Sequence, residues 1–227
     1  MIHNIVSIAV PCVTRAGITL NDTVTNIMRG GFSYLHLSME PGFDNQDLAR
    51  LKNTTPDIAH AHQHKFTLGH LTNFMYCWKW LLETTDTEYL MVVENDVRFC
   101  PSAASKLLQV IEREKGKPLG LISMFTPDTH VYEAIKTTPA LDGWVDIRPG
   151  ILASAGQCIC MRRTVVEQLF TRNDFLAIDW FINEFCKQNQ LPVWQAIPSL
   201  ADHIATHSAV RREHWPCHRG LQYNDEG

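Results

Sequence analysis

A run of five apolar residues, Tyr89 to Val93, leads directly into Glu94-Asn95-Asp96, and this stretch constrains the fold more than any other. A continuous apolar run of this length is typical of a strand that is buried on both faces of a sheet. In open α/β sheets, ligands bind beyond the carboxyl ends of the strands. Because polar side chains follow this strand at once, we expect a binding site there, and its carboxylates suit a cation.

The patterns on both sides of this run predict one α/β domain, in which helices flank a mostly parallel central sheet. Further strands are expected at 5–10, 34–39, 119–124, 144–148, 155–161 and 193–197. Helices are expected at 21–28, 68–83, 102–116, 163–170 and 179–188, with a short helical turn at 47–52. The strands at 144–148 and 155–161 are expected to be antiparallel, which places a small antiparallel part in the C-terminal half.

Local signals set several expected boundaries. Pro11 is expected to end the first strand, and Asn21 or Asp22 to cap the first helix. Ser102 is expected to cap a later helix, which Gly116 ends. Residues 53–65, with three alternating histidines at 60, 62 and 64, are interpreted as an irregular loop, and the polar tail 198–227 as partly loose.

Composition limits the classes of partner. The 227 residues contain 20 Lys and Arg against 24 Asp and Glu, and the net charge of −4 disfavours a whole-protein attraction to nucleic acid. Seven cysteines without a disulfide-framework spacing indicate reduced thiols. The opening residues carry no signal-peptide pattern and no membrane span, so we expect a cytoplasmic protein without a membrane partner.

Four stretches, in order, resemble the GT-A fold glycosyltransferases, which are metal-dependent and use nucleotide sugars. The stretch "YLMVVENDVRF", which follows a helix containing Asn73, resembles their DxD region. Residues 150–163, "GILASAGQCICMRR", resemble the small-residue segment that shapes the donor-sugar pocket. The stretch "IDWFINEF" at 178–185 resembles a helix start after the acceptor loop, and "PSLADHIATHSAV" at 198–210 resembles the closing stretch of such domains.

The resemblance implies a Rossmann-like domain with a nucleotide-sugar-binding half at 1–99 and an acceptor-binding half at 100–227. It also implies a Mn²⁺ or Mg²⁺ site. Asp96 matches the last acid of DxD, the direct metal ligand, and Glu94 matches the first acid. Asn95 replaces the middle acid, and its amide can bond a ribose or donor-sugar hydroxyl. His203 matches a histidine that reaches back to the metal in some families, with His207 as a neighbouring candidate.

Other residues are candidates for roles in such a transfer. Asp179 is the candidate general base that takes the acceptor hydroxyl proton, although it can equally be a helix N-cap. Glu40, at the end of the second strand, is expected to accept from a uracil or ribose, or else to be a solvent-facing acid. Trp144 and Trp180 are candidates for stacking or for core packing. The residues expected to contact the nucleotide sugar are Arg15, Glu40, Asn73, Glu94, Asn95 and Gly156.

These observations predict a glycosyltransferase that moves a sugar from a nucleotide diphosphate donor, expected to be a UDP-sugar such as UDP-glucose, to an acceptor hydroxyl. The segment 203–219 contains three arginines, four histidines and Trp215, and is either a solvated tail or a nucleic-acid contact. We therefore expect the acceptor to be DNA with a hydroxymethylated base, as for bacteriophage DNA glycosyltransferases, or else a saccharide or small molecule. The alternatives are a nucleotidyltransferase on a similar sheet and a non-catalytic module that binds nucleotides or nucleic acid.

Overall fold

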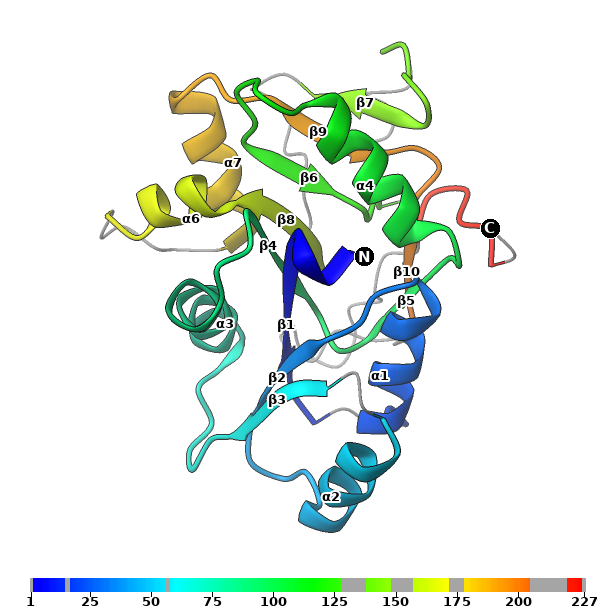
Figure 1. The fold of residues 1–227 in the computed structure, drawn as a ribbon, viewed down its shortest axis with the longest axis vertical. Coiled ribbons are helices and arrows are strands. Elements are labelled where there is room, and N and C mark those ends of the chain that lie inside the picture. Colours follow the sequence, from blue (N-terminus) through cyan, green and yellow to red (C-terminus); the bar gives the residue numbers. More distant parts are fainter. Residues whose placement is uncertain are drawn as a thin grey trace.

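The computed structural model describes residues 2–14, 17–55, 58–127, 138–147, 157–171, 178–204 and 220–225. A central sheet is covered by helices on both faces (Figure 1). This arrangement confirms the expected α/β class.

The main sheet has eight strands in the order β3-β2-β1-β4-β8-β6-β9-β7. Strands β1 to β4 pair in parallel, whereas β8 is antiparallel to both β4 and β6. Strand β9 is parallel to β6, and β7 is antiparallel to β9. The strands are β1 (Val6–Cys12), β2 (Leu35–Met39), β3 (Ile58–Gln63), β4 (Tyr89–Val93), β6 (Leu121–Ser123), β7 (Trp144–Asp146), β8 (Cys158–Arg162) and β9 (Val193–Ala196). The expected mostly parallel sheet with a C-terminal antiparallel part is therefore confirmed.

Strand β4 lies inside the sheet, and alternate side chains enter two different cores. Tyr89, Met91 and Val93 join a cluster that includes residues of α1 (Leu20–Arg29) and α4 (Ala103–Arg113). Leu90 and Val92 join a second cluster with residues of α3 (His70–Thr84), α6 (Arg163–Leu169) and α7 (Ile178–Gln188). Burial on both faces explains why the strand is continuously apolar, and at about 25 cal/mol per Å² such burial is a major stabilising contribution.

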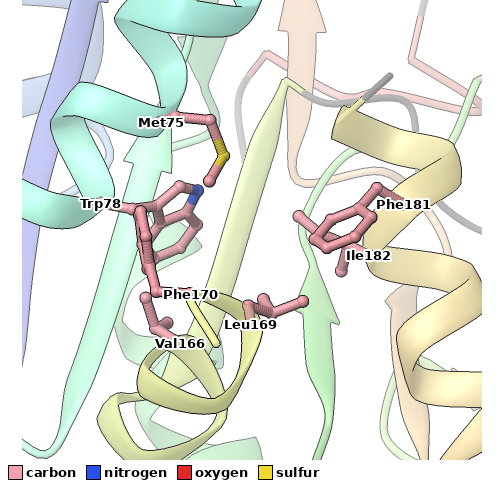
Figure 2. Close-up of a pocket in the computed structure, with 7 residues that line it drawn as sticks. All are labelled: Met75, Trp78, Val166, Leu169, Phe170, Phe181 and Ile182. Carbon is pink, nitrogen blue, oxygen red and sulfur yellow. The ribbon is translucent and has the colours of Figure 1, made fainter. Parts of the chain in front are cut away.

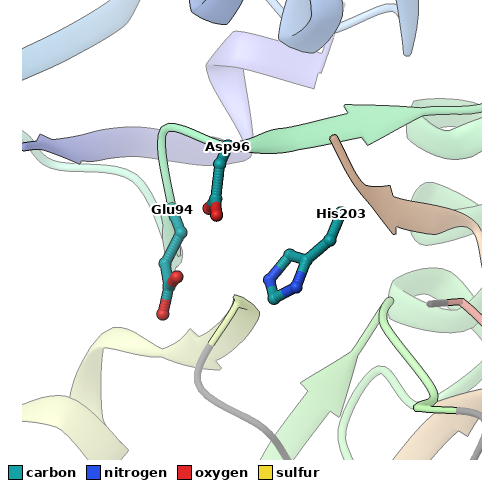
Figure 3. Close-up of side chains that lie close together, drawn as sticks. All are labelled: Glu94, Asp96 and His203. Carbon is teal, nitrogen blue, oxygen red and sulfur yellow. The ribbon is translucent and has the colours of Figure 1, made fainter. Parts of the chain in front are cut away.

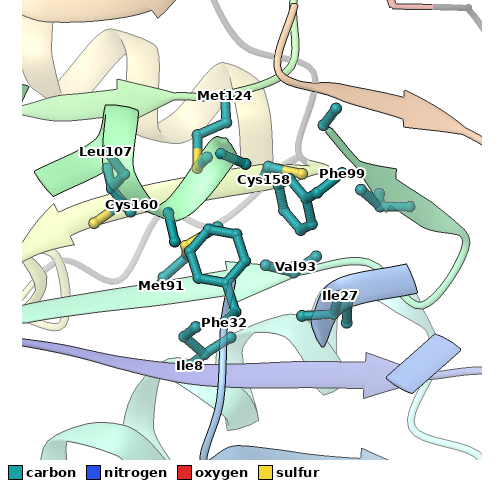
Figure 4. Packing of buried hydrophobic residues seen from close by; sticks show 14 of the residues in the cluster. Ile8, Ile27, Phe32, Met91, Val93, Phe99, Leu107, Met124, Cys158 and Cys160 are labelled. Atoms are coloured by element: carbon teal, nitrogen blue, oxygen red, sulfur yellow. The ribbon is translucent and has the colours of Figure 1, made fainter. Parts of the chain in front are cut away.

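The first cluster brings the region after β4 against the start of the chain (Figure 4). Phe99, which ends the short strand β5 (Val97–Phe99), packs on Phe32 with ring centroids 4.8 Å apart. Gly30 fits beneath this pair, because a Cβ there would lie 2.6 Å from the Cβ of Phe99. The core therefore fixes the direction in which the chain leaves β4.

Two cap assignments need correction. Thr19, not Asn21 or Asp22, is the N-cap of α1, and Asp22 is the third helical residue that completes a capping box with it. Ser102 does occupy the N-cap position of α4, but its hydroxyl makes no capping hydrogen bond. The expected end of this helix at Gly116 is too late, because α4 ends at Arg113 with Glu114 as its C-cap, and Gly116 lies in the turn that follows, with a φ of +78°.

The prediction that Pro11 ends β1 is wrong, because β1 continues to Cys12. Strand β4 pairs with β1 only as far as Ala9, so Pro11 faces no β4 partner that needs its missing N–H. The proposed loop at 53–65 is also wrong. Its residues 58–63 form β3 at the edge of the sheet, and the preceding helical turn extends to α2 (Asn45–Thr54).

The tail 198–227, expected to be partly loose, contains an ordered strand. Ala201–His203 forms β10, which pairs antiparallel with β5 as a separate two-stranded sheet. Each of these strands has three residues, so the pairing and not the local sequence defines them. This small sheet brings the C-terminal part of the chain beside the end of β4.

Two further findings concern the lengths of the helices and the state of the cysteines. No helix in the described ranges is long and apolar enough to cross a membrane. Six cysteines in the same ranges have free thiols, and all six are buried.

Candidate functional site

The polar turn after β4 is held by backbone hydrogen bonds from two sides. The Glu94 N–H donates to the Gln157 carbonyl, just before β8, at 2.8 Å. The Ile204 N–H, just after β10, donates to the Asp96 carbonyl at 2.8 Å. The turn therefore lies at the carboxyl edge of the parallel strands, between the start of β8 and the end of β10, where the fold class places ligands.

Three predicted residues meet at this turn. One ligand atom from each of Glu94, Asp96 and His203 lies within 4.8 Å of the others (Figure 3). The three residues are 7%, 0% and 5% exposed. Within the described ranges, this is the one group of three or more His, Cys, Asp or Glu side chains with such spacing. The sequence separates His203 from Asp96 by more than a hundred positions, and the β5–β10 pairing closes that gap.

The His203 ring is oriented by its surroundings. His203 is the last residue of β10 and pairs with Val97 of β5. Its imidazole stacks on Phe125, with ring centroids 5.1 Å apart and an interplanar angle of 23°. Because strand register and stacking both restrict the ring, a ligand nitrogen is presented to the acids without a large entropy loss.

The two acids create a negative field in a buried region. Burial, and then the charges of Glu94 and Asp96, raise the pKa of the Cys158 thiol well above its ordinary value. Buried carboxylates at this spacing repel each other, and a divalent cation would neutralise them. Two carboxylates and an imidazole are donors that suit Mn²⁺, and the carboxylates also suit Mg²⁺. The residues present therefore fit a metal ion of the expected kind.

Asn95 has a different place from its two neighbours. Its side-chain amide donates to the Val13 carbonyl at 2.9 Å and accepts from the Val13 N–H at 3.5 Å. Its own carbonyl accepts from the Thr23 hydroxyl of α1 at 2.8 Å. Asn95 therefore ties the turn after β4 to the segment after β1 and to α1. A direct contact between its side chain and a nucleotide sugar stays a prediction.

Glu40 and Asn73 lie at the junction of β2 and α3. Glu40 is 8% exposed, and its Oε1 accepts from the Gly69 N–H at 2.8 Å, so the reading as a solvent-facing acid is wrong. Asn73 is fully buried, and its Oδ1 accepts from the Ser38 hydroxyl at 2.6 Å. The Ser38 hydroxyl also lies 2.8 Å from the His64 Nε2. The contacts predicted for Glu40 and Asn73 with a nucleotide sugar are not tested by this geometry.

Several predicted residues lie outside the described ranges. Arg15, Gly156 and the segment 205–219, with His207, belong to this set, as does the side chain of Asp179 at the start of α7. The two tryptophans separate clearly. Trp144 is 1% exposed and belongs to the first core cluster, so it is a core residue, whereas Trp180 is 47% exposed.

His70 is a site residue that the sequence reasoning missed. It is the first residue of α3, and its Nε2 lies 2.9 Å from Oε1 of Glu94. A histidine at a helix start has no periodic signal. The only clue in the sequence is its position directly after Gly69, where a helix begins.

A small apolar cavity lies between α3, α6 and α7 (Figure 2). Its volume of about 10 Å³ is close to the minimum for one water molecule and far below that of a nucleotide-sugar site. The cavity therefore supplies no donor pocket. It is lined by Met75, Trp78, Val166, Leu169, Phe170, Phe181 and Ile182.

Comparison with known proteins supports the fold. No protein-family model and no curated protein sequence matches the chain. A mannosyltransferase of Pyrobaculum calidifontis, solved in complex with GDP-Man and Mn²⁺, superposes with a TM-score of 0.57 at 14% identity. The match covers 83% of this chain but only 53% of the mannosyltransferase, so the chain spans about half of that protein.

A second solved structure matches over more of its own length. A protein described as a glucose-1-phosphate thymidylyltransferase of Bacillus anthracis, in complex with sucrose, has a TM-score of 0.56 at 8% identity. The match covers 87% of this chain and 89% of that protein. At such identities the two likenesses establish a shared GT-A-like fold, and they leave the reaction to be argued from the site.

Proposed function

We propose that the chain is a metal-dependent glycosyltransferase that moves a sugar from a nucleotide diphosphate donor to an acceptor hydroxyl. The observation that carries the proposal is the meeting of Glu94, Asp96 and His203 at the carboxyl edge of a GT-A-like sheet. Burial and side-chain chemistry fit a divalent cation, and such cations are commonly shared between carboxylates and substrate phosphates.

In this proposal Asp96 and His203 hold Mn²⁺ or Mg²⁺, and Glu94 contacts the ion or the donor. The bound ion supplies positive charge that stabilises the departing diphosphate. The bond between the sugar's anomeric carbon and the diphosphate oxygen breaks, and a bond from that carbon to the acceptor oxygen forms. Asp179 takes the acceptor's proton if the reaction inverts configuration.

The donor is proposed to lie along the carboxyl ends of β1, β2 and β4. Glu40 directly follows β2, Asn95 follows β4, and Arg15 belongs to the segment after β1. Asn73 and Gly156 complete the proposed donor contacts. Uracil is the proposed base of the donor nucleotide. The mannosyltransferase with the same fold was instead solved with a guanine nucleotide sugar, GDP-Man. The donor test therefore needs both bases.

The proposed acceptor is DNA that carries a hydroxymethylated base, bound through the basic segment 203–219. Three arginines and an aromatic side chain in that segment suit a phosphate backbone with stacked bases. Binding of hydroxymethylated DNA and plain DNA, each at several salt concentrations, tests this. Equal binding of both, with no sugar transferred to either, would leave a saccharide as the acceptor.

The test of the transferase uses release of nucleoside diphosphate. The protein is incubated with Mn²⁺ and a panel of UDP- and GDP-sugars, with and without acceptor. We expect release with one donor, loss of release in EDTA, and loss in Asp96→Ala. The matched control is Glu114→Gln, another buried acid, which pairs with Arg113 at 3.0 Å and should keep activity. No release with any donor, together with no thermal shift, would overturn the proposal.

Nucleotidyl transfer is the second candidate because the thymidylyltransferase matches the chain over nearly its full length. That reaction consumes a nucleoside triphosphate and a sugar phosphate and releases pyrophosphate. The same protein preparation, tested for pyrophosphate release, separates the two reactions. The glycosyltransferase proposal expects none.

A further inference from the structure

We propose that the start of α3 is a clamp that sets the position of Glu94, with His70 as its positioning residue. This inference rests on the proposed metal-dependent function and adds a residue to it. The clamp consists of Glu40, Gly69, His70 and Glu94. It connects the end of β2, through two consecutive helix-start residues, to the end of β4.

The contact between His70 and Glu94 has the geometry of a strong hydrogen bond. Nε2 of His70 lies 2.9 Å from Oε1 of Glu94. An ionised carboxylate only accepts, so the imidazole donates its Nε2–H. The Glu94 side chain is 9% exposed and that of His70 is 22% exposed, which limits competition from water. His70 therefore restricts the rotation of a carboxyl group that faces Asp96 and His203.

The backbone that carries His70 is itself fixed. The Gly69 N–H donates to Oε1 of Glu40 at 2.8 Å. Gly69 is the N-cap residue of α3 and has no side chain that could cap the helix. Its φ of +76° is a conformation that glycine adopts without strain. One turn later, the Asn73 amide bonds to Ser38 of β2, which gives the helix a second anchor. The start of α3 is thus attached to Ser38 of β2 and to Glu40 just after it, while its histidine reaches Glu94 just after β4.

In this arrangement His70 affects the metal site indirectly, through a residue that it holds in place. Partners of metal ligands orient those ligands, and removing them typically lowers metal affinity about 10–100-fold. Loss of the His70 imidazole would leave Glu94 with more rotational freedom, so each metal-bound geometry would cost more entropy. We therefore expect His70 to act through Glu94 on metal affinity without touching the ion.

Calorimetric titration with Mn²⁺ alone tests the clamp. Variants at position 70 show whether the side chain must contact Glu94 or whether any polar side chain at this position is sufficient. The amide nitrogen of Gln lies near the position of Nε2, whereas that of Asn lies near Nδ1 and cannot reach Glu94. We expect His70→Ala and His70→Asn to lower Mn²⁺ affinity about 10–100-fold, and His70→Gln to stay within a few-fold of the original chain. The control is His62→Gln, an exposed histidine of β3, which should leave the affinity unchanged.

A second pair of variants tests the other end of the clamp. Glu40→Gln keeps an oxygen that accepts from Gly69 and should keep Mn²⁺ affinity, whereas Glu40→Ala should lower it. Thermal unfolding of every variant is recorded, and if an alanine variant does not fold, the Gln and Asn pair at position 70 still decides.

The outcomes separate the clamp from the function. If the original chain binds Mn²⁺ and turns over a donor, but His70→Asn binds Mn²⁺ as tightly as His70→Gln, the clamp is wrong and the transferase proposal stands. If the original chain binds no Mn²⁺, the metal assignment fails and the clamp fails with it. A loss confined to His70→Ala and His70→Asn, with rescue by His70→Gln, supports the clamp, because a purely structural role would not depend on reach.

Discussion

Binding of a divalent cation at the triad should stabilise the folded chain, and removal of one acid should abolish that stabilisation. The donor atoms of Glu94, Asp96 and His203 lie within 4.8 Å of one another, so two negative charges share a buried region. At an effective dielectric constant of about 20, two unit charges 4.8 Å apart repel by roughly 3 kcal/mol, which sets the order of magnitude of what the acids cost each other.

Mn²⁺ that binds only the folded state adds stability by mass action. At a free ion concentration of about 100 times Kd, the gain is about 2.7 kcal/mol. For a chain of this size, 1 kcal/mol shifts Tm by roughly 2–4 °C, so we expect a rise of about 5–10 °C. The measurement is differential scanning fluorimetry in EDTA and in increasing Mn²⁺.

The substitution Asp96→Asn preserves the shape of the side chain and removes one charge. In EDTA we expect its Tm at or above that of the original chain, because the repulsion with Glu94 is relieved. In Mn²⁺ we expect no rise, because the main ligand charge is lost. The control is Glu114→Gln. It removes the charge of a buried acid that pairs with Arg113 and Lys117, outside the triad, and should still show the full rise. An equal Mn²⁺ shift in Asp96→Asn would show that Asp96 is not the main ligand of the ion.

Further predictions concern stability. Burial and the charge of His60 lower the pKa of His36 from 6.5 to about 4, so the unfolded chain binds the proton first as pH falls. Stability from this residue is present above pH 6.5 and is lost towards pH 4, by at most about 3 kcal/mol because the ring is partly exposed. Urea titrations should therefore show a weaker loss over this window for His36→Gln than for the original chain, and an equal loss would contradict the assignment. Trp144→Ala should cost about 3–5 kcal/mol by creating a core cavity, and a cost below 1 kcal/mol would contradict its core position. Gly30→Ala should destabilise by about 1–3 kcal/mol because its Cβ meets Phe99, and an unchanged Tm would show that the contact relaxes freely.

The sequence predicts those parts of the fold whose signal is local and periodic. The Tyr89–Val93 strand and the α3 helix were recognisable because burial on two faces, or on one stripe, leaves a clear pattern. Strand β3 was missed because it lies at the edge of the sheet, where its alternating histidines face Trp80 and Tyr76 or solvent in place of a hydrophobic core. Strand β10 was missed because three residues carry no pattern, and only pairing with β5 makes them a strand.

The site was predictable at the positions where the sequence matches motifs of the glycosyltransferase family that it resembles. Asp96 and His203 were placed together by it, and the geometry brings them within reach of a common ion. His70 was not predictable in this way, since its contact with Glu94 depends on how α3 is anchored to β2. The bonding of Asn95 to Val13 was missed for the same reason, because it depends on the packing of two loops.

The most direct test of the metal-dependent nucleotide-sugar site is diffraction from crystals grown with Mn²⁺ and UDP, recorded at a wavelength where manganese scatters anomalously. We expect one strong peak at coordination distance from an oxygen of Asp96 and a nitrogen of His203, with Glu94 and the diphosphate beside it. A manganese peak elsewhere on the protein, with no peak between these three side chains, would contradict the metal assignment.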